Sequence, residues 1–211
     1  MRKTLLLLLS LVGLFDALYL WWVYTSPSRP MVCLGGGCDA VRQSPFAYPM
    51  GIPMPMPGAL MYAVLALLIF AEPLFQASRA RLVRNAVAGI AGLGFLFSLY
   101  LTGVEAFVIH AWCFWCVISA IVVTLIFGLA LLDVLRPLPA PEPAAALTAA
   151  KNHLLCVVVA AAIGVPAFIL LAKSGTPPPL SYIPPEVLKR LVREDSHVTG
   201  NPGARLTVVE F

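Results

Sequence analysis

Four of the five cysteines in this sequence form two close pairs, a pattern typical of reversible thiol–disulfide chemistry. Cys113 and Cys116 make a C-x-x-C motif, and Cys33 and Cys38 enclose a segment with three consecutive glycines. Cys156 stands alone in an apolar run and is expected to be an inert, small apolar side chain. Paired cysteines that face an oxidising compartment are disulfides or redox centres, whereas the same pairs in the cytosol would suggest a metal site.

The C-x-x-C motif falls at the start of a predicted helix. Residues three apart on a helix lie about 5–6 Å apart on one face, which is within reach of a disulfide. A helix N-terminus also stabilises a thiolate, and this favours dithiol exchange. We expect Cys116 to lie one turn deeper and to face a lipid-soluble electron acceptor, and Cys113 to lie nearer the water and face the loop.

The segment from Cys33 to Cys38 differs in character, because its three glycines favour flexibility and positive φ angles. Exchange between the pairs requires a thiolate of one pair to reach a disulfide sulfur of the other. We therefore interpret a mobile loop pair and a helix-anchored pair as a relay. Two other interpretations stay open, namely two structural disulfides and a zinc site with four cysteine ligands.

The composition places these cysteines in a membrane protein. Of the 211 residues, 60% are hydrophobic and only 11% are charged, and the mean hydropathy is +0.91. Soluble domains are less apolar and about a quarter charged. The net charge of +4 does not indicate nucleic-acid binding, because the basic residues are scattered between apolar runs and form no basic stripe.

Five apolar stretches are long enough to cross a bilayer, which takes roughly 20 residues. They are residues 4–24, 58–76, 84–111, 114–135 and 151–172. The first stretch lacks a small-x-small cleavage site and ends in an aromatic belt, so we interpret it as an uncleaved anchor rather than a signal peptide. The expected fold class is therefore an all-α integral membrane protein.

The basic residues orient the chain in the bilayer. A cytoplasmic N-terminus places seven of them on the inner side: Arg2, Lys3, Arg79, Arg81, Arg84, Arg136 and Lys151. The outer loop, residues 25–57, then holds only Arg29 and Arg42, in agreement with the positive-inside rule. This orientation puts both cysteine pairs on the outer face.

Beyond the fourth span, the sequence predicts a tether and the start of another domain. Residues 136–150 are expected to form a cytoplasmic connector, and residues 151–173 a fifth transmembrane helix. Proline-rich residues 174–199 follow as an outer linker with one short helix. Residues 200–211 are strand-like, and a single strand cannot bury its faces, so we expect them to begin a further domain.

Taken together, the motifs resemble the vitamin K epoxide reductase family in its bacterial form. The resemblance covers residues 5–135 and is carried by Cys33–Asp39, Ser44-Pro45, Gly51-Ile52-Pro53, Gly58, Tyr62, Phe97–Leu101, Glu105 and Trp112–Val117. It implies that residues 1–135 form a catalytic four-helix bundle around a quinone site, with the fifth helix as a tether. Residues 200–211 look like the first strand of a thioredoxin-like domain, which is often fused at this point in bacterial members.

The resemblance also implies a role for each paired cysteine. By similarity, Cys33 exchanges with an external thioredoxin-like partner, and Cys38 exchanges with Cys113. Cys116 is then the thiol that reacts with the quinone. Ser44 matches a hydroxyl residue beside the loop in bacterial relatives, and would help to order the cap over the site.

Four further residues are candidates for the quinone site. Asp16 lies in the middle of the first span, where a charge is expensive, and both a structural hydrogen bond and a proton role stay open. Glu105 precedes the C-x-x-C motif by about two turns and is a candidate proton donor, with an interfacial hydrogen bond or salt bridge as the alternative. Trp112 and Trp115 are candidate quinone contacts because they are close to Cys116 in the sequence.

The sequence thus predicts a quinone-dependent thiol–disulfide oxidoreductase of the bacterial inner membrane. It would generate disulfides in extracytoplasmic proteins, with ubiquinone or menaquinone as the electron acceptor and without a metal. Its partner would be a thioredoxin-like domain, either fused beyond residue 211 or on a separate protein. The alternative is a non-catalytic membrane anchor for a thioredoxin-like domain, with cysteines that form structural disulfides.

Overall fold

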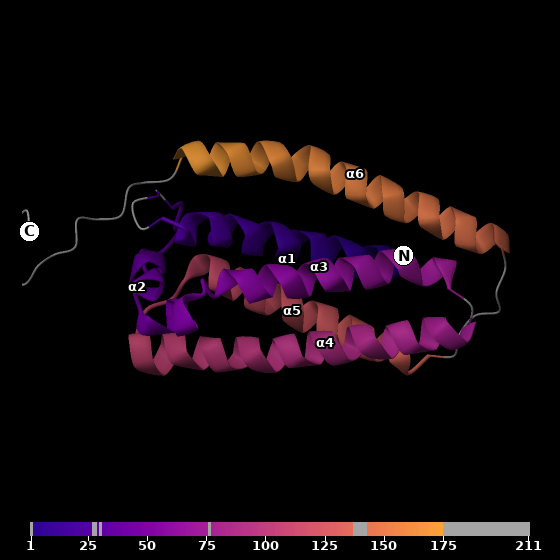
Figure 1. Cartoon of the computed structure of the whole chain (residues 1–211), viewed down its shortest axis with the longest axis horizontal. Coiled ribbons are helices and arrows are strands. Elements are labelled where there is room, and N and C mark those ends of the chain that lie inside the picture. Colours follow the sequence, from indigo (N-terminus) through magenta and orange to yellow (C-terminus); the bar gives the residue numbers. More distant parts are fainter. Residues whose placement is uncertain (1, 27–28, 30, 76, 137–142, 175–211) are drawn as a thin grey trace, which may run out of the picture. The chain divides into compact units, whose positions relative to one another are not determined.

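Figure 1 shows a computed structural model of the chain, which describes residues 2–26, 29, 31–75, 77–136 and 143–174. The chain divides into two units, residues 1–178 and 179–211, and the described residues all belong to the first unit. The predicted linker over residues 174–199 lies outside the described residues apart from Ser174, and so does the predicted strand over residues 200–211.

In the described part of the chain, five helices are long and apolar enough to cross a membrane. They are α1 (Arg2–Tyr24), α3 (Pro55–Ala71), α4 (Ala77–Val104), α5 (Phe114–Val134) and α6 (Pro143–Ser174). This confirms the expected all-α membrane protein with five spans.

The fifth helix starts earlier than the sequence suggested. It begins at Pro143, inside the predicted connector of residues 136–150, and not at residue 151. Proline is well tolerated at the first position of a helix, and the alanines that follow it are strong helix formers. Residues 143–150 of the predicted connector are therefore helical, and residues 137–142 lie outside the described residues.

Four helices surround one apolar core, and the fifth lies beside them (Figure 1). Leu7 of α1, Leu65 of α3, Ala91 of α4 and Ile126 of α5 are all buried in this core. Helix α6 lies along α1 and stays largely exposed, as expected for a helix that faces lipid on most of its surface. The arrangement is the expected four-helix bundle with an additional helix.

Charged side chains meet at one end of the bundle, which we call the charged end. The Asp133 carboxylate accepts a hydrogen bond from Arg2 at 2.6 Å and pairs with Arg84 Nε at 2.9 Å. Nearby, Lys3 pairs with the buried carboxylate of Glu72. An unpaired charge in such surroundings is strongly destabilising, so these pairs allow acidic and basic groups to lie inside the helix ends.

The opposite end, which we call the cysteine end, is closed by the segment between α1 and α3. This segment contains α2 (Cys38–Arg42) and the 3-10 turns η1 (Pro45–Ala47) and η2 (Pro49–Gly51). At the same end, α4 continues into the π-helical turn η4 (Glu105–Ile109), which leads into α5. The two cysteine pairs therefore lie at one end of the bundle, as the sequence predicted.

We expect the substitution Asp133→Ala to lower the free energy of unfolding by about 3–5 kcal/mol, because it leaves the buried Arg84 guanidinium without its carboxylate. The measurement is reversible unfolding of the purified protein in detergent. Arg81→Ala removes an exposed cation nearby on α4 and should change stability by less than about 0.5 kcal/mol. Equal effects of the two substitutions would contradict a stabilising role for the Asp133 pairs.

A candidate dithiol active site at the cysteine end

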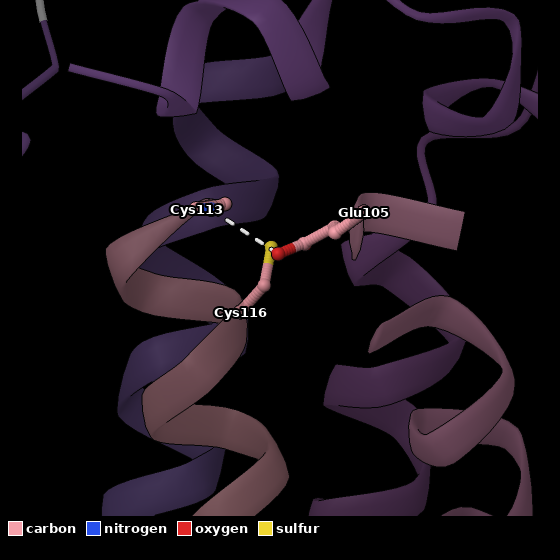
Figure 2. A group of neighbouring side chains, drawn as sticks. All are labelled: Glu105, Cys113 and Cys116. Carbon is pink, nitrogen blue, oxygen red and sulfur yellow. Dashed lines mark hydrogen bonds between the residues drawn. The ribbon is translucent and has the colours of Figure 1, made fainter. Parts of the chain in front are cut away.

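The C-x-x-C motif lies at the start of α5, beside a carboxylate from the end of α4 (Figure 2). Cys113 is the residue before the helix, and its backbone N–H donates a hydrogen bond of 3.1 Å to Glu105 Oε2. The Glu105 carboxylate oxygen and the sulfurs of Cys113 and Cys116 all lie within 4.8 Å of one another. Figure 2 shows the side chains of Glu105 and Cys116 meeting beside Cys113.

A break in the helical pattern of α4 brings Glu105 to this position. The turn Glu105–Ile109 is π-helical and ends at His110, which adopts a left-handed conformation with φ of 55°. The backbone N–H of Ala111 then donates to the Glu105 carbonyl at 3.2 Å. Single π-helical turns occur frequently at functional sites, and here the wider turn ends α4 with the Glu105 carboxylate directed at the thiols.

The two thiols differ in their surroundings, but not as the sequence suggested. Cys113 was expected to lie nearer the water, yet it is 0% exposed because the segment that carries the other cysteine pair covers it. Cys116 is partly accessible, and it lines an internal cavity of the bundle. Cys116 lies deeper along α5, as expected, and its contact with an electron acceptor stays a prediction, whereas the water-facing position of Cys113 was wrong.

The other cysteine pair, Cys33 and Cys38, forms a disulfide. Gly35 and Gly36 between them are exposed and have φ angles of 99° and 78°, a conformation that favours glycine. Close packing explains the third glycine, Gly37. A Cβ atom at this position would lie 2.4 Å from the backbone oxygen of Trp112. A positive φ angle therefore accounts for two glycines, and close packing on the C-x-x-C segment accounts for the third.

Two aromatic side chains form hydrogen bonds with the backbone of the residue before this disulfide. Trp115 donates its indole N–H to the Val32 carbonyl at 2.6 Å, and the Tyr19 hydroxyl accepts the Val32 N–H at 3.1 Å. The rings of Tyr19 and Trp115 lie against each other, with their centroids 4.8 Å apart. The residue before Cys33 is thus held from both sides by the bundle.

Neither tryptophan that the sequence suggested as a quinone contact lines the cavity. Trp115 is buried and directed toward Val32, where its N–H finds the carbonyl that a buried indole needs. Trp112 is 55% exposed at the cysteine end. Its backbone packs against Gly37. In the structure both residues support the loop, and their role as quinone contacts stays a prediction.

The cavity lies inside the four-helix bundle and has a volume of about 390 Å³. Its wall is mostly apolar and comes from α1, α3, α4, α5 and the segment that closes the cysteine end. A few polar side chains interrupt this wall: Asp16, Tyr24, Ser44, Tyr62, Ser98, Thr102, Glu105, Cys116 and Ser119. An apolar cavity with a small number of polar groups is the usual form of a small-molecule site.

Ser44 closes the cavity where the sequence expected it to help the cap. Its hydroxyl donates to the Val41 carbonyl at 2.7 Å, at the junction of α2 and the turn η1. Both residues line the cavity. Arg42, which is buried in the same segment, donates to the Arg29 carbonyl at 3.0 Å and pairs with Asp39. The cap is thus ordered by its own hydrogen bonds.

Sequence reasoning gave no role to Tyr24 and Ser119, and it used Tyr62 only as part of a motif. Tyr24 was interpreted as part of an interfacial aromatic belt, yet it is buried at the cavity. The Tyr62 hydroxyl lies 3.0 Å from Ser119 Oγ. The only sequence signal was that Ser119 follows Cys116 by three residues and therefore shares its helix face.

Comparison of the sequence with known protein families shows what kind of protein carries this site. The sequence model of the vitamin K epoxide reductase family matches residues 4–131, which is more than half of the chain. The chain belongs to the vitamin K epoxide reductase family. No curated protein matches it in a sequence comparison. As a member of this family, it is a multi-pass membrane oxidoreductase, and its two cysteine pairs fit redox roles.

We expect Gly37→Ala to reduce contact between the two pairs, because the new Cβ atom would clash with the Trp112 backbone. The measurement is the yield of a Cys38–Cys113 disulfide in a protein in which Cys33 and Cys116 are replaced by alanine. Mass spectrometry detects this disulfide. Gly36→Asn is the matched control, since Gly36 faces open space and asparagine tolerates a positive φ. An unchanged yield in Gly37→Ala would show that this close approach does not position the pairs.

Proposed function

We propose that this protein moves electrons from the thiols of a thioredoxin-like protein to a membrane quinone through its two cysteine pairs. The observation that carries the proposal is the position of Cys116, between the buried thiol of Cys113 and the apolar cavity. The cavity fits an apolar ring with few polar substituents, and it opens among helices that lie in lipid.

The exposures of the four sulfurs support a defined order of exchange. Cys33 is partly exposed at the end of the bundle, whereas its disulfide partner Cys38 is buried. Cys113 is buried in the same apolar cluster as Cys38, and Cys116 lines the cavity. A partner thiol therefore has access to Cys33, Cys38 is next to Cys113, and only Cys116 faces the cavity.

The exchange steps balance without an additional oxidant. A partner dithiol attacks the Cys33–Cys38 disulfide through a mixed disulfide at Cys33, leaving the partner oxidised and both loop cysteines as thiols. Cys38 then attacks the oxidised C-x-x-C pair at Cys113, so that the loop disulfide re-forms and both helix cysteines become thiols. The bound quinone would take up the two electrons and two protons that this dithiol releases when it closes to a disulfide.

Glu105 is placed to handle a proton at Cys116. Its carboxylate lies beside both thiols, and one oxygen accepts the Cys113 N–H, which fixes the orientation of the group. A positioned carboxylate of this kind takes a thiol proton as the sulfur becomes nucleophilic. We therefore assign Glu105 the role of general base for the dithiol.

The direction of electron flow rests on the predicted orientation. Basic residues place the charged end in the cytoplasm and the cysteine end outside, where an oxidising compartment requires a path from protein thiols to quinone. We propose that the protein lies in a bacterial plasma membrane and generates disulfides in extracytoplasmic proteins. The thioredoxin-like partner is either a domain that begins at residues 200–211 or a separate protein.

Metal binding is the second candidate function, because Glu105, Cys113 and Cys116 are close enough to act as three ligands. The four-cysteine zinc site is not assembled, since Cys33 and Cys38 are joined to each other. A buried Cys–Cys–Glu set is also the arrangement that a redox dithiol needs. The zinc content of the purified protein separates the two functions, because the relay requires none.

The proposal predicts different defects for two alanine substitutions. Cys116→Ala should abolish quinone reduction with every thiol donor, because the sulfur in the cavity wall is lost. Cys33→Ala should abolish turnover with a thioredoxin-like protein and preserve turnover with a small dithiol, which reaches the buried pair without the loop disulfide. The measurement is the absorbance change of a short-chain quinone in detergent. Wild-type turnover by Cys33→Ala with the protein donor would refute the order of exchange.

Glu105→Gln should lower the rate of quinone reduction about 10²-fold, because the amide cannot take a proton from Cys116. The amide oxygen still accepts the Cys113 N–H, so the motif should keep its geometry. The rate of Cys33–Cys38 reduction by the protein donor, followed in single-turnover experiments, is the internal control and should not change. A quinone reduction rate equal to that of wild type would exclude Glu105 as the base.

A further inference from the structure

Asp16 carries a buried carboxyl group that has no role in the proposed relay. It lies in the middle of α1 and is 2% exposed, and it lines the cavity. Among the described residues, no side chain or backbone group forms a hydrogen bond of good geometry with either carboxylate oxygen. A polar group buried without a partner costs free energy, and an acidic residue within a span is a candidate functional site.

Two hydroxyl groups lie beside Asp16 on the cavity wall. The Tyr62 hydroxyl lies 3.1 Å from the Ser119 carbonyl and 3.0 Å from Ser119 Oγ, and the Ser119 side chain is close to the carboxyl group. Gly13 makes room for this tyrosine, because a Cβ atom there would lie 2.3 Å from its ring. The three polar side chains come from α1, α3 and α5, and they form a group that we call the distal cluster.

The distal cluster lies deeper in the bundle than the dithiol. Ser119 follows Cys116 by three residues of α5, so it lies about 4.5 Å further along the helix axis on the same face. Both residues line the cavity. The two oxygens of a 1,4-quinone lie at opposite ends of one ring, at a comparable separation. A ring with one oxygen at Cys116 would therefore direct the other toward the distal cluster.

We propose that Asp16, Tyr62 and Ser119 bind the quinone oxygen that is remote from Cys116. This inference rests on the proposed function and extends it, because it assigns a second polar contact to the same cavity. The cluster acts by positioning the ring: its hydroxyl and carboxyl groups donate hydrogen bonds to the remote oxygen, while Cys116 and Glu105 act at the near one. The unsatisfied carboxyl of Asp16 obtains its partner from the ligand.

A purely structural role does not account for Asp16. Tyr62 and Ser119 form a hydrogen bond with each other, and neither forms one of good geometry with an Asp16 oxygen. The ion pairs that hold the bundle together, at Asp133 and Glu72, lie at the charged end and involve other residues. An apolar side chain at position 16 would pack in α1 without the cost of an unpaired polar group. The carboxyl group is therefore explained by a ligand in the cavity.

The test is binding of a decyl-substituted 1,4-benzoquinone to the purified protein in detergent, with all variants made in a Cys116→Ala background that prevents turnover. Asp16→Leu, Tyr62→Phe and Ser119→Ala should each weaken binding up to about tenfold, the effect of losing one hydrogen bond. Tyr100→Phe and Thr124→Val are the matched controls. They remove hydroxyl groups outside this cavity wall and should leave the dissociation constant unchanged.

Infrared spectra of the bound quinone, labelled with ¹³C at one carbonyl at a time, assign the contact to one oxygen. A cluster variant should shift the stretching band of one carbonyl to higher frequency and leave the other in place. Asp16→Asn should restore part of the shift, because the amide still donates a hydrogen bond. Unchanged bands and an unchanged dissociation constant in all three cluster variants would overturn the inference.

Thermal unfolding separates loss of the contact from loss of the fold. Asp16→Leu removes an unpartnered group, so its unfolding temperature should equal or exceed that of the parent protein. A lower unfolding temperature together with weaker binding would assign Asp16 to structure and overturn its role as a ligand contact. If the parent protein bound no quinone, the proposed function would itself be wrong. If the wild-type protein reduces quinone and the cluster variants bind it like the parent, only the distal cluster is excluded.

Discussion

The hydrogen bond from the Cys113 amide to the Glu105 carboxylate is the contact on which the site depends. A helix that starts inside a membrane protein has N–H groups without partners, and each must find an acceptor. Here the acceptor for the first turn of α5 is a side chain from the end of α4. One contact therefore satisfies the start of the helix, joins two spans and fixes a carboxylate beside the thiols.

The same requirement explains how the two cysteine pairs approach each other. The loop that carries Cys33 contributes its Val32 N–H and carbonyl to Tyr19 and Trp115, so its backbone is satisfied by side chains of the bundle. Gly37 then allows the loop to pack against the Trp112 backbone without an intervening side chain. Only Gly35 and Gly36 face open space, and Gly37 packs directly on the C-x-x-C segment.

Much of this arrangement was predictable from residue types and spacing, because span length, charge bias and cysteine pairs are local signals. The spans, the common end of the two pairs and the position of Cys116 at a cavity follow from such signals. The burial of Cys113 and the contact of Glu105 do not, because they depend on a π-helical turn and on how the loop folds back. The sequence also did not show that Trp112 and Trp115 lie outside the cavity wall, since closeness in sequence does not give the direction of a side chain.

The dithiol lies between two environments that must not mix, and the bundle separates them. Cys33 is partly exposed at the surface, whereas Cys38 and Cys113 are buried in one cluster at the same end of the bundle. Cys116 alone of the four sulfurs faces the apolar space. In the proposed relay, electrons would therefore leave the loop by exchange between the covered sulfurs of Cys38 and Cys113. This arrangement would let one membrane protein couple a thiol reaction at its surface to an acceptor in the apolar cavity.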